Sequence, residues 1–66
     1  MRLTVNGREM SVEPVLSVEA LVTSLTAARR GVAVAVNGAV VPRSTWAVVT
    51  LADGDAVEVL TAAQGG

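Results

Sequence analysis

Apolar and polar residues alternate at the start of the chain. Leu3 and Val5 are separated by polar residues, with the period of two that is typical of a strand with one buried face. The pair Asn6-Gly7 follows and favours a type I′ hairpin turn, because both central positions of that turn need positive φ. A second alternating run continues through Val12 and ends before Pro14, which cannot donate to a strand ladder. We therefore predict a β-hairpin at the N-terminal end.

The apolar spacing changes to a helical period in the next segment. Ser17 is a suitable N-cap, and Glu19 places a negative charge in the first turn, where the helix dipole favours it. Arg29 and Arg30 suit the negative end of the dipole, and Gly31 suits the C′ position. One apolar stripe at helical spacing is predicted to face the core: Val18, Leu21, Val22, Leu25 and Ala28.

The second half of the chain predicts further strands with an irregular segment between them. Residues 32–36 form an apolar run, the pair Asn37-Gly38 repeats the hairpin pattern, and Pro42 stops the short strand that follows. Ser44 is a candidate cap for a single helical turn around Trp46. We expect no regular strand from Pro42 until the last strand of the chain.

The last strand follows a turn at residues 53–55, where two aspartates flank one glycine. Val57 and Val59 then alternate with Glu58 and Leu60, so the two pairs are predicted to lie on opposite faces of the sheet. The valines suit the buried face, which leaves Leu60 on the face that points away from the helix.

The resulting order, two strands, a helix and then two or three strands, predicts an α+β fold. One helix must cover one face of a mixed sheet of four to five strands. The economical arrangement pairs the first and last strands in parallel at the sheet centre, with a right-handed crossover through the helix. This is the β-grasp, or ubiquitin-like, architecture. We expect residues 1–62 to form this domain and residues 63–66 to form a flexible tail.

Composition narrows the classes of function. The chain has 66 residues, of which 52% are hydrophobic, and has no cysteine, so an apolar core must hold it without disulfides. The net charge is −1 and the five basic residues are scattered, which argues against a nucleic-acid partner. No apolar run approaches the ~20 residues that span a bilayer, and no secretion signal is recognisable. We expect a cytoplasmic protein that does not bind membranes.

Side chains that could carry chemistry are few. The sequence has no histidine, cysteine or lysine to activate a serine or threonine, and two aspartates in one turn rarely suffice for a metal. We therefore expect neither an enzyme nor a metal site. The remaining candidate is the carboxylate of Gly66, which another protein could activate with ATP. Gly65 and Gly66 lack Cβ atoms, so an extended tail can pass through a narrow tunnel and the reacting carbonyl is unhindered.

Five short motifs stand out in the second half of the chain: Val36-Asn37-Gly38, Val41-Pro42-Arg43-x-x-Trp46, Leu51-x-Asp53-Gly54-Asp55, Val57-Glu58-Val59 and Gln64-Gly65-Gly66. Together they resemble the ThiS group of sulfur carrier proteins in thiamine biosynthesis, and the resemblance covers the whole chain. A terminal diglycine also occurs in the small subunit of molybdopterin synthase and in ubiquitin. The Val-Pro-Arg-x-x-Trp segment is the discriminating part, and the N-terminal half matches in pattern more than in residues.

The resemblance implies a mechanism in which the chain is a co-substrate. An E1-like adenylyltransferase (ThiF-like or MoeB-like) would adenylate the Gly66 carboxylate with ATP and Mg²⁺, which that partner binds. A persulfide donor would displace AMP and leave a thiocarboxylate. A ThiG-like thiazole synthase would then take the sulfur. The carrier itself would bind no cofactor.

Partner contacts are expected near the tail and around the aromatic residue. Leu60 and Ala62 are predicted to form an apolar docking surface, and Gln64 belongs to the tail motif. Trp46 could anchor a partner, although partial burial against the irregular segment is favoured. Arg43 could pair with an acidic partner surface or, within the chain, with one of the aspartates of the turn at 53–55.

Three other functions are compatible with the sequence. The chain could carry sulfur for molybdopterin or another product, with the same chemistry and a different acceptor enzyme. It could modify proteins through isopeptide bonds, although the absence of lysine excludes chains of the modifier linked through its own lysines. It could be a ubiquitin-like interaction module that is never activated, in which case Gly66 could be deleted without loss of function.

Overall fold

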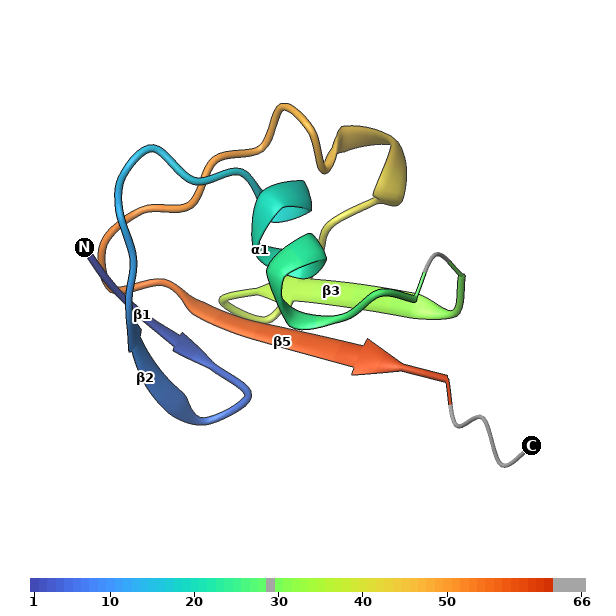
Figure 1. Cartoon of the computed structure of the whole chain (residues 1–66), viewed down its shortest axis with the longest axis horizontal. Helices are drawn as coiled ribbons and strands as arrows, with labels where there is room; N and C mark the ends of the chain where they lie inside the picture. Colours follow the sequence, from blue (N-terminus) through green and yellow to red (C-terminus); the bar gives the residue numbers. More distant parts are fainter. Residues whose placement is uncertain (29, 63–66) are drawn as a thin grey trace.

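The computed structural model describes residues 1–28 and 30–62 and shows one sheet with a helix across one face (Figure 1). Its elements in chain order are β1 (Arg2–Val5), β2 (Arg8–Ser11), α1 (Val18–Leu25), β3 (Val32–Val36), β4 (Ala39–Val40), the 3₁₀ helix η1 (Arg43–Thr45) and β5 (Ala56–Thr61). The strand order is β2-β1-β5-β3-β4. Strands β1 and β5 are parallel and β5 is central, as the sequence predicts. The α+β, β-grasp prediction is confirmed.

Both predicted Asn-Gly turns are present. Asn6 and Asn37 have φ values of 51° and 52°, and the glycines that follow have φ values of 83° and 86°. Positive φ at both central residues is the geometry of a type I′ turn, which matches the twist of the flanking strands. These turns set the register of the β1–β2 and β3–β4 hairpins.

The N-terminal end of α1 is closed as predicted, with one addition. The Ser17 hydroxyl accepts a hydrogen bond from the N–H of Ala20 at 3.0 Å. The irregular segment 46–51 supplies two further acceptors, because the N–H of Val18 donates to the C=O of Val49 at 2.9 Å and the N–H of Glu19 donates to the C=O of Trp46 at 3.1 Å. The first turn of the helix therefore leaves few free donors.

The C-terminal end of α1 corrects the sequence prediction. The helix ends at Leu25, and Thr26 is extended, with φ −152° and ψ 147°. The hydroxyl of Thr26 accepts from the N–H of Ala28 at 3.0 Å, a local bond that competes with another helical turn. Leu25 is 42% exposed and Ala28 is exposed, so neither completes the predicted stripe.

The predicted helix-ending residues also change role. Arg30 lies beyond the helix and is not in its last turn, and Arg29 lies outside the described residues. Gly31 has positive φ, +70°, but it immediately precedes β3 and does not cap the helix. Ser44 is a second correction: it lies inside η1, whose N-cap is Pro42 with no side-chain hydrogen bond.

The core lies between α1 and the sheet. Alternation in β1, β3 and β5 turns one side chain in two toward the helix, and segment 46–51 closes one end. The buried residues form one cluster: Leu3, Val5, Val18, Leu21, Val22, Val34, Trp46, Leu51, Val57 and Val59. No helix of the described residues covers the back of the sheet.

Candidate functional site

The back of the sheet exposes apolar side chains beside the end of β5. Leu60 is 67% exposed and lies opposite Ala33 of β3 in the strand register. Val40 of β4 is 77% exposed and pairs with Ala35 of the same β3 strand. We call Leu60, Ala33, Ala35 and Val40 the back-face patch. Ala35 is half-buried, and the exposed Glu58 of β5 lies opposite it on the same face, so a carboxylate borders the patch. Exposed apolar side chains grouped in this way mark protein–protein contact more often than isolated exposed residues do.

Backbone pairing continues one residue beyond the ladder of β5 with β3, which ends at Thr61 opposite Val32. The N–H of Ala62 donates to the C=O of Gly31 at 2.6 Å. A Cβ at Gly31 would lie 2.8 Å from the Cβ of Ala62, so a glycine is needed for this close approach. By alternation Ala62 lies on the same face as Leu60, and both are exposed, as the predicted docking surface requires.

The predicted reactive tail follows directly from this strand end. Gln64, Gly65 and Gly66 lie outside the described residues, as does the whole proposed tail, 63–66. Figure 1 shows β5 pointing toward the end of the molecule that lies opposite the N-terminus. Gly66 is four residues beyond Ala62, which an extended chain can place at most about 14 Å away.

Trp46 has the structural role that the sequence favoured. Its side chain is 5% exposed, and its Nε1 donates to the C=O of Val41 at 2.9 Å. The guanidinium of Arg43 lies 5.0 Å from the ring centroid, a cation–π contact. The two residues line a groove with Glu19 and Thr23 of α1, on the helix side of the sheet. They are therefore not brought together with Leu60, and contact of either with a partner stays a prediction.

A model of the ThiS family matches residues 3–66 of the chain. The chain belongs to the ThiS family. Its fold agrees with two solved structures of one thiamine biosynthesis protein (ThiS) from Geobacter metallireducens. The crystal structure is 40% identical with full coverage of both chains and a TM-score of 0.80. The solution structure is 40% identical over all of this chain and 88% of that one, with a TM-score of 0.83.

A longer relative is also similar to this ThiS-family chain. A thiazole synthase of Paramagnetospirillum magneticum (strain AMB-1) is 39% identical over 66 residues, which is all of this chain and 20% of that protein. The chain therefore spans about a fifth of the length of the curated relative that it matches.

The aspartates of the ThiS-family motif form a turn and do not pair with Arg43. Oδ1 of Asp53 accepts from the backbone N–H of Arg2 at 2.6 Å, and Oδ2 of Asp55 accepts from the N–H of Ala52 at 2.8 Å. Oδ1 of Asp55 accepts from Nδ2 of Asn37 at 2.9 Å. Both carboxylates are thus used to hold the loop. Over residues 1–28 and 30–62 no group of three or more acidic, histidine or cysteine side chains could hold a metal ion.

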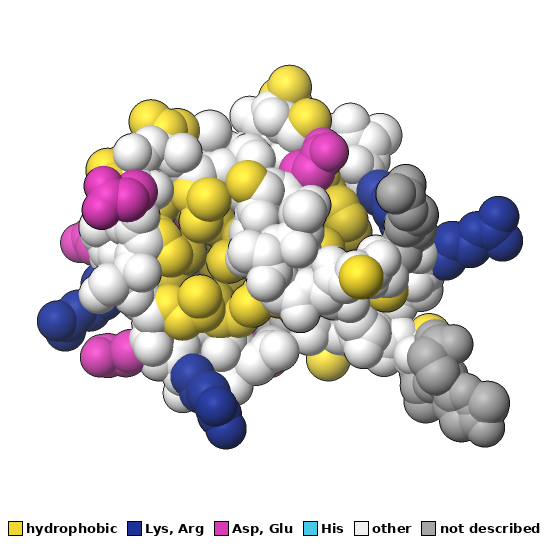
Figure 2. Space-filling model, viewed as in Figure 1, with side chains coloured by type: hydrophobic (Ala, Val, Ile, Leu, Met, Phe, Trp, Pro, Cys, Tyr) yellow, Lys and Arg dark blue, Asp and Glu magenta, His cyan; other side chains and the backbone are white. Residues whose placement is uncertain are grey.

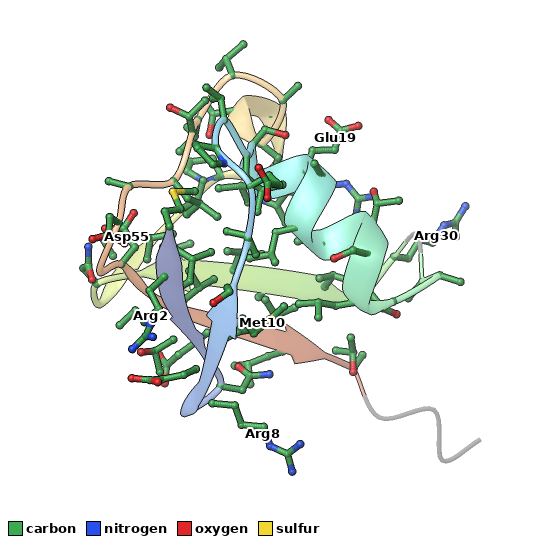
Figure 3. All side chains as sticks on the ribbon, turned by 60° about the vertical axis from the view of Figure 1, so that its left-hand side comes forward. Arg2, Arg8, Met10, Glu19, Arg30 and Asp55 are labelled. Atoms are coloured by element: carbon green, nitrogen blue, oxygen red, sulfur yellow. The ribbon has the colours of Figure 1, made fainter. Side chains whose placement is uncertain are left out.

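The three arginines labelled in Figure 3 do not gather into one patch. Figure 3 shows the labelled arginines Arg2, Arg8 and Arg30 well apart on the molecule. Arg2 forms an ion pair with Glu9, at 3.7 Å, on the exposed hairpin. Within the described part of the chain, no helix has the length and hydrophobicity needed to cross a membrane.

A second apolar region lies on the helix side. Figure 2 shows hydrophobic side chains at the surface between the β1–β2 hairpin and α1. A shallow groove there is lined by Met10, Leu25, Val5 and Val59, with Asn6 and Arg8 among its polar residues. It forms because α1 ends at Leu25 and leaves that part of the sheet uncovered.

Sequence reasoning found Leu60 and missed its neighbours in the back-face patch. The run at residues 32–36 alternates valine with alanine. The structure buries Val34 and turns Ala33 to the surface, so the larger residue of each pair marks the packed face. The identity of the strand beside Leu60 required the sheet order, which the sequence alone does not specify.

Proposed function

We propose that this ThiS-family chain is a sulfur carrier protein of thiamine biosynthesis and not itself an enzyme. The observation that carries the proposal is the match to the ThiS family over residues 3–66, which includes the diglycine. Its similarity to a thiamine biosynthesis protein and to a thiazole synthase supports the pathway, and the second similarity supports a thiazole synthase as the acceptor enzyme. We place this activity in the cytoplasm.

The proposed chemistry takes place at Gly66. Its carboxylate attacks the α-phosphorus of ATP in the active site of an E1-like adenylyltransferase, which also supplies Mg²⁺, and pyrophosphate leaves. The terminal sulfur of a persulfide donor attacks the acyl-adenylate carbonyl and displaces AMP. A thiol then reduces the new S–S bond and releases the thiocarboxylate. Thiazole synthase takes this sulfur, and the carrier returns to its carboxylate form.

The structure supports a role for β5 in positioning the proposed reactive end. Strand β5 is hydrogen-bonded to β1 on one side and to β3 on the other, so the point from which the chain continues is fixed by the sheet. The back-face patch lies beside that end, and its member Leu60, together with the exposed Ala62 on the same face, offers an apolar docking surface nearest to the end of β5. A partner that covers this patch would meet the chain where it leaves β5. Gly65 and Gly66 lack side chains that would obstruct a narrow active site.

The first test is loading of the purified carrier, followed by intact mass spectrometry. The protein is incubated with ATP, Mg²⁺, an E1-like adenylyltransferase and sulfide. We expect a mass gain equal to one sulfur minus one oxygen, localised to Gly66. The mass of the untreated protein must correspond to a free α-carboxylate on that residue, since the chemistry needs one.

Deletion of Gly66 is the matched variant. We expect it to abolish loading while leaving the denaturation midpoint unchanged, because Gly66 is four positions beyond Ala62 in the sequence and has no side chain to contribute to the core. Loading that survives the deletion would move the reactive group elsewhere. Absence of loading in the wild type, with adenylyltransferases that each load their own carrier, would favour a ubiquitin-like interaction module or a protein modifier.

A further inference from the structure

Two asparagines make similar contacts with β5, Asn37 with its first residue, Ala56, and Asn6 with Val59, two residues before the strand ends at Thr61. The N–H of Asn37 donates to the C=O of Ala56 at 2.7 Å, and its Oδ1 accepts from the N–H of Ala56 at 2.9 Å. Nδ2 of Asn6 donates to the C=O of Val59 at 3.1 Å, and its Oδ1 accepts from the N–H of Val59 at 2.8 Å. Each asparagine therefore supplies both a donor and an acceptor to one residue of β5.

Asn6 acts where the neighbouring strand has already ended. The parallel β1–β5 pairing stops at Val5 opposite Val57, and the last backbone bond on this edge runs from the N–H of Asn6 to the C=O of Val57, at 2.9 Å. The antiparallel ladder with β3 turns the N–H and C=O of Val59 away from β3, toward this edge. The side-chain amide of Asn6 thus replaces a strand residue that β1 does not provide.

We infer that Asn6 is a positioning residue for the C-terminal end of β5 and for the chain that continues from it. The inference deepens the proposed function, and it rests on that function only for the use of the positioned end, the presentation of Gly66 to the activating enzyme. When the side-chain amide of Asn6 is removed, the C-terminal part of β5 is held only by its hydrogen bonds to β3. The strand end then samples more directions, and fewer carriers align their carboxylate with the active site.

Glycine substitution separates this role from general stability. Asn6→Gly removes the amide but tolerates positive φ, and Gly-Gly is an accepted type I′ turn. Asn37→Gly is the control at the start of β5: it also removes two side-chain hydrogen bonds, one with the N–H of Ala56 and one with Asp55, but it keeps the backbone bond from its N–H to the C=O of Ala56. In Asn6→Gly we expect hydrogen exchange of the Val59 amide to accelerate about tenfold, and in Asn37→Gly by less than about twofold. Asn6→Asp keeps an acceptor for the Val59 N–H and should fall between the wild type and Asn6→Gly.

The functional measurement is single-turnover adenylation of each variant over a range of carrier concentrations. We expect Asn6→Gly to lower the rate at saturation about tenfold with a half-saturating concentration within about twofold of wild type. Asn37→Gly should change neither quantity by more than about twofold. An equal loss of rate in both glycine variants would overturn the inference, since it would indicate general destabilisation. Faster exchange at Val59 without any loss of rate would also overturn it.

Different results contradict the proposed function and the positioning role of Asn6. A wild-type chain that no adenylyltransferase adenylates, although each is active on its own carrier, contradicts the proposed function. Hydrogen exchange does not depend on any partner, so it tests the positioning role in either case. An unchanged exchange rate of Val59 in Asn6→Gly contradicts that role even if the wild type loads normally.

Discussion

Strand β5 presents apolar side chains on both of its faces, and only one face is covered. Val57 is 1% exposed and Val59 is 8% exposed, whereas Leu60 on the other face is 67% exposed. Burial of a side chain of this size contributes about 1.5–3 kcal/mol to folding, so the first face is explained by stability. Burial of Leu60 contributes little to the folding free energy of the free protein, because most of its side chain stays exposed. The comparison shows that one face of the central strand contributes to the core, and it motivates the proposal that the other face docks a partner.

The same substitution on the two faces of the sheet tests this comparison with the largest expected effect on stability. Leu3→Ala empties a site that is 1% exposed and should lower the free energy of unfolding by about 2–5 kcal/mol. Leu60→Ala should change it by less than about 0.5 kcal/mol. Urea denaturation followed by circular dichroism measures both. Similar losses for the two variants would show that Leu60 also packs in the folded state.

A charge at Leu60 tests the functional half of the comparison. Leu60→Glu should leave the urea midpoint unchanged and lower the rate of sulfur loading at least about tenfold, because a carboxylate would be buried against an apolar partner surface. Val48→Glu is the matched control, since Val48 is 78% exposed and lies in the segment that packs on the helix side. If both variants load at the wild-type rate, the back-face patch is not the docking surface.

Glycine-to-alanine changes test how closely the end of β5 is held. Gly31 and Gly7 both have positive φ, +70° and +83°, so alanine strains both by about 1–2 kcal/mol. At Gly31 the new Cβ would also approach the Cβ of Ala62 to 2.8 Å, whereas at Gly7 there is no atom of the described residues within 4 Å. We expect Gly31→Ala to cost more stability and to accelerate hydrogen exchange of the Ala62 amide. Equal costs would mean that Ala62 moves away freely.

The smallest expected effect concerns Trp46. Trp46→Phe keeps most of the buried ring but removes the hydrogen bond from Nε1 to the C=O of Val41, a loss of about 1 kcal/mol. Because the ring lies on the helix side of the sheet, sulfur loading should stay within about twofold of wild type. Thermal unfolding and the loading assay measure the two quantities. A large loss of loading with normal stability would restore Trp46 as a partner contact.

Much of the fold could be predicted because its determinants are local. Asn-Gly pairs specify type I′ turns, Ser17 caps the helix through a side chain three positions from its partner, and alternation assigns the faces of β5. The end of the helix was predicted wrongly because the apolar period continues through Ala28. The hydrogen bond from the N–H of Ala28 to the Thr26 hydroxyl favours a helix that ends near Leu25, and the spacing of apolar residues does not predict this bond.

The candidate site was only partly predictable. Exposure of Leu60 follows from alternation, and the sequence points to the Gly66 carboxylate because it contains few other groups that could react. The contacts of Asn6 with Val59 could not be predicted, because the two residues are 53 positions apart and meet only through the parallel pairing of β1 with β5. The same pairing places Asp53 beside the backbone N–H of Arg2. The Asp53 carboxylate accepts a hydrogen bond there and does not form the predicted ion pair with Arg43.

The most direct test of the central claim is to follow the sulfur itself. The carrier is loaded at Gly66 with a heavy sulfur isotope, purified, and incubated with active thiazole synthase and its other substrates. The account predicts that the label appears in the thiazole product and that the carrier returns to its carboxylate mass. A loaded carrier that keeps its label, while another carrier delivers sulfur to the same enzyme preparation, would contradict the account.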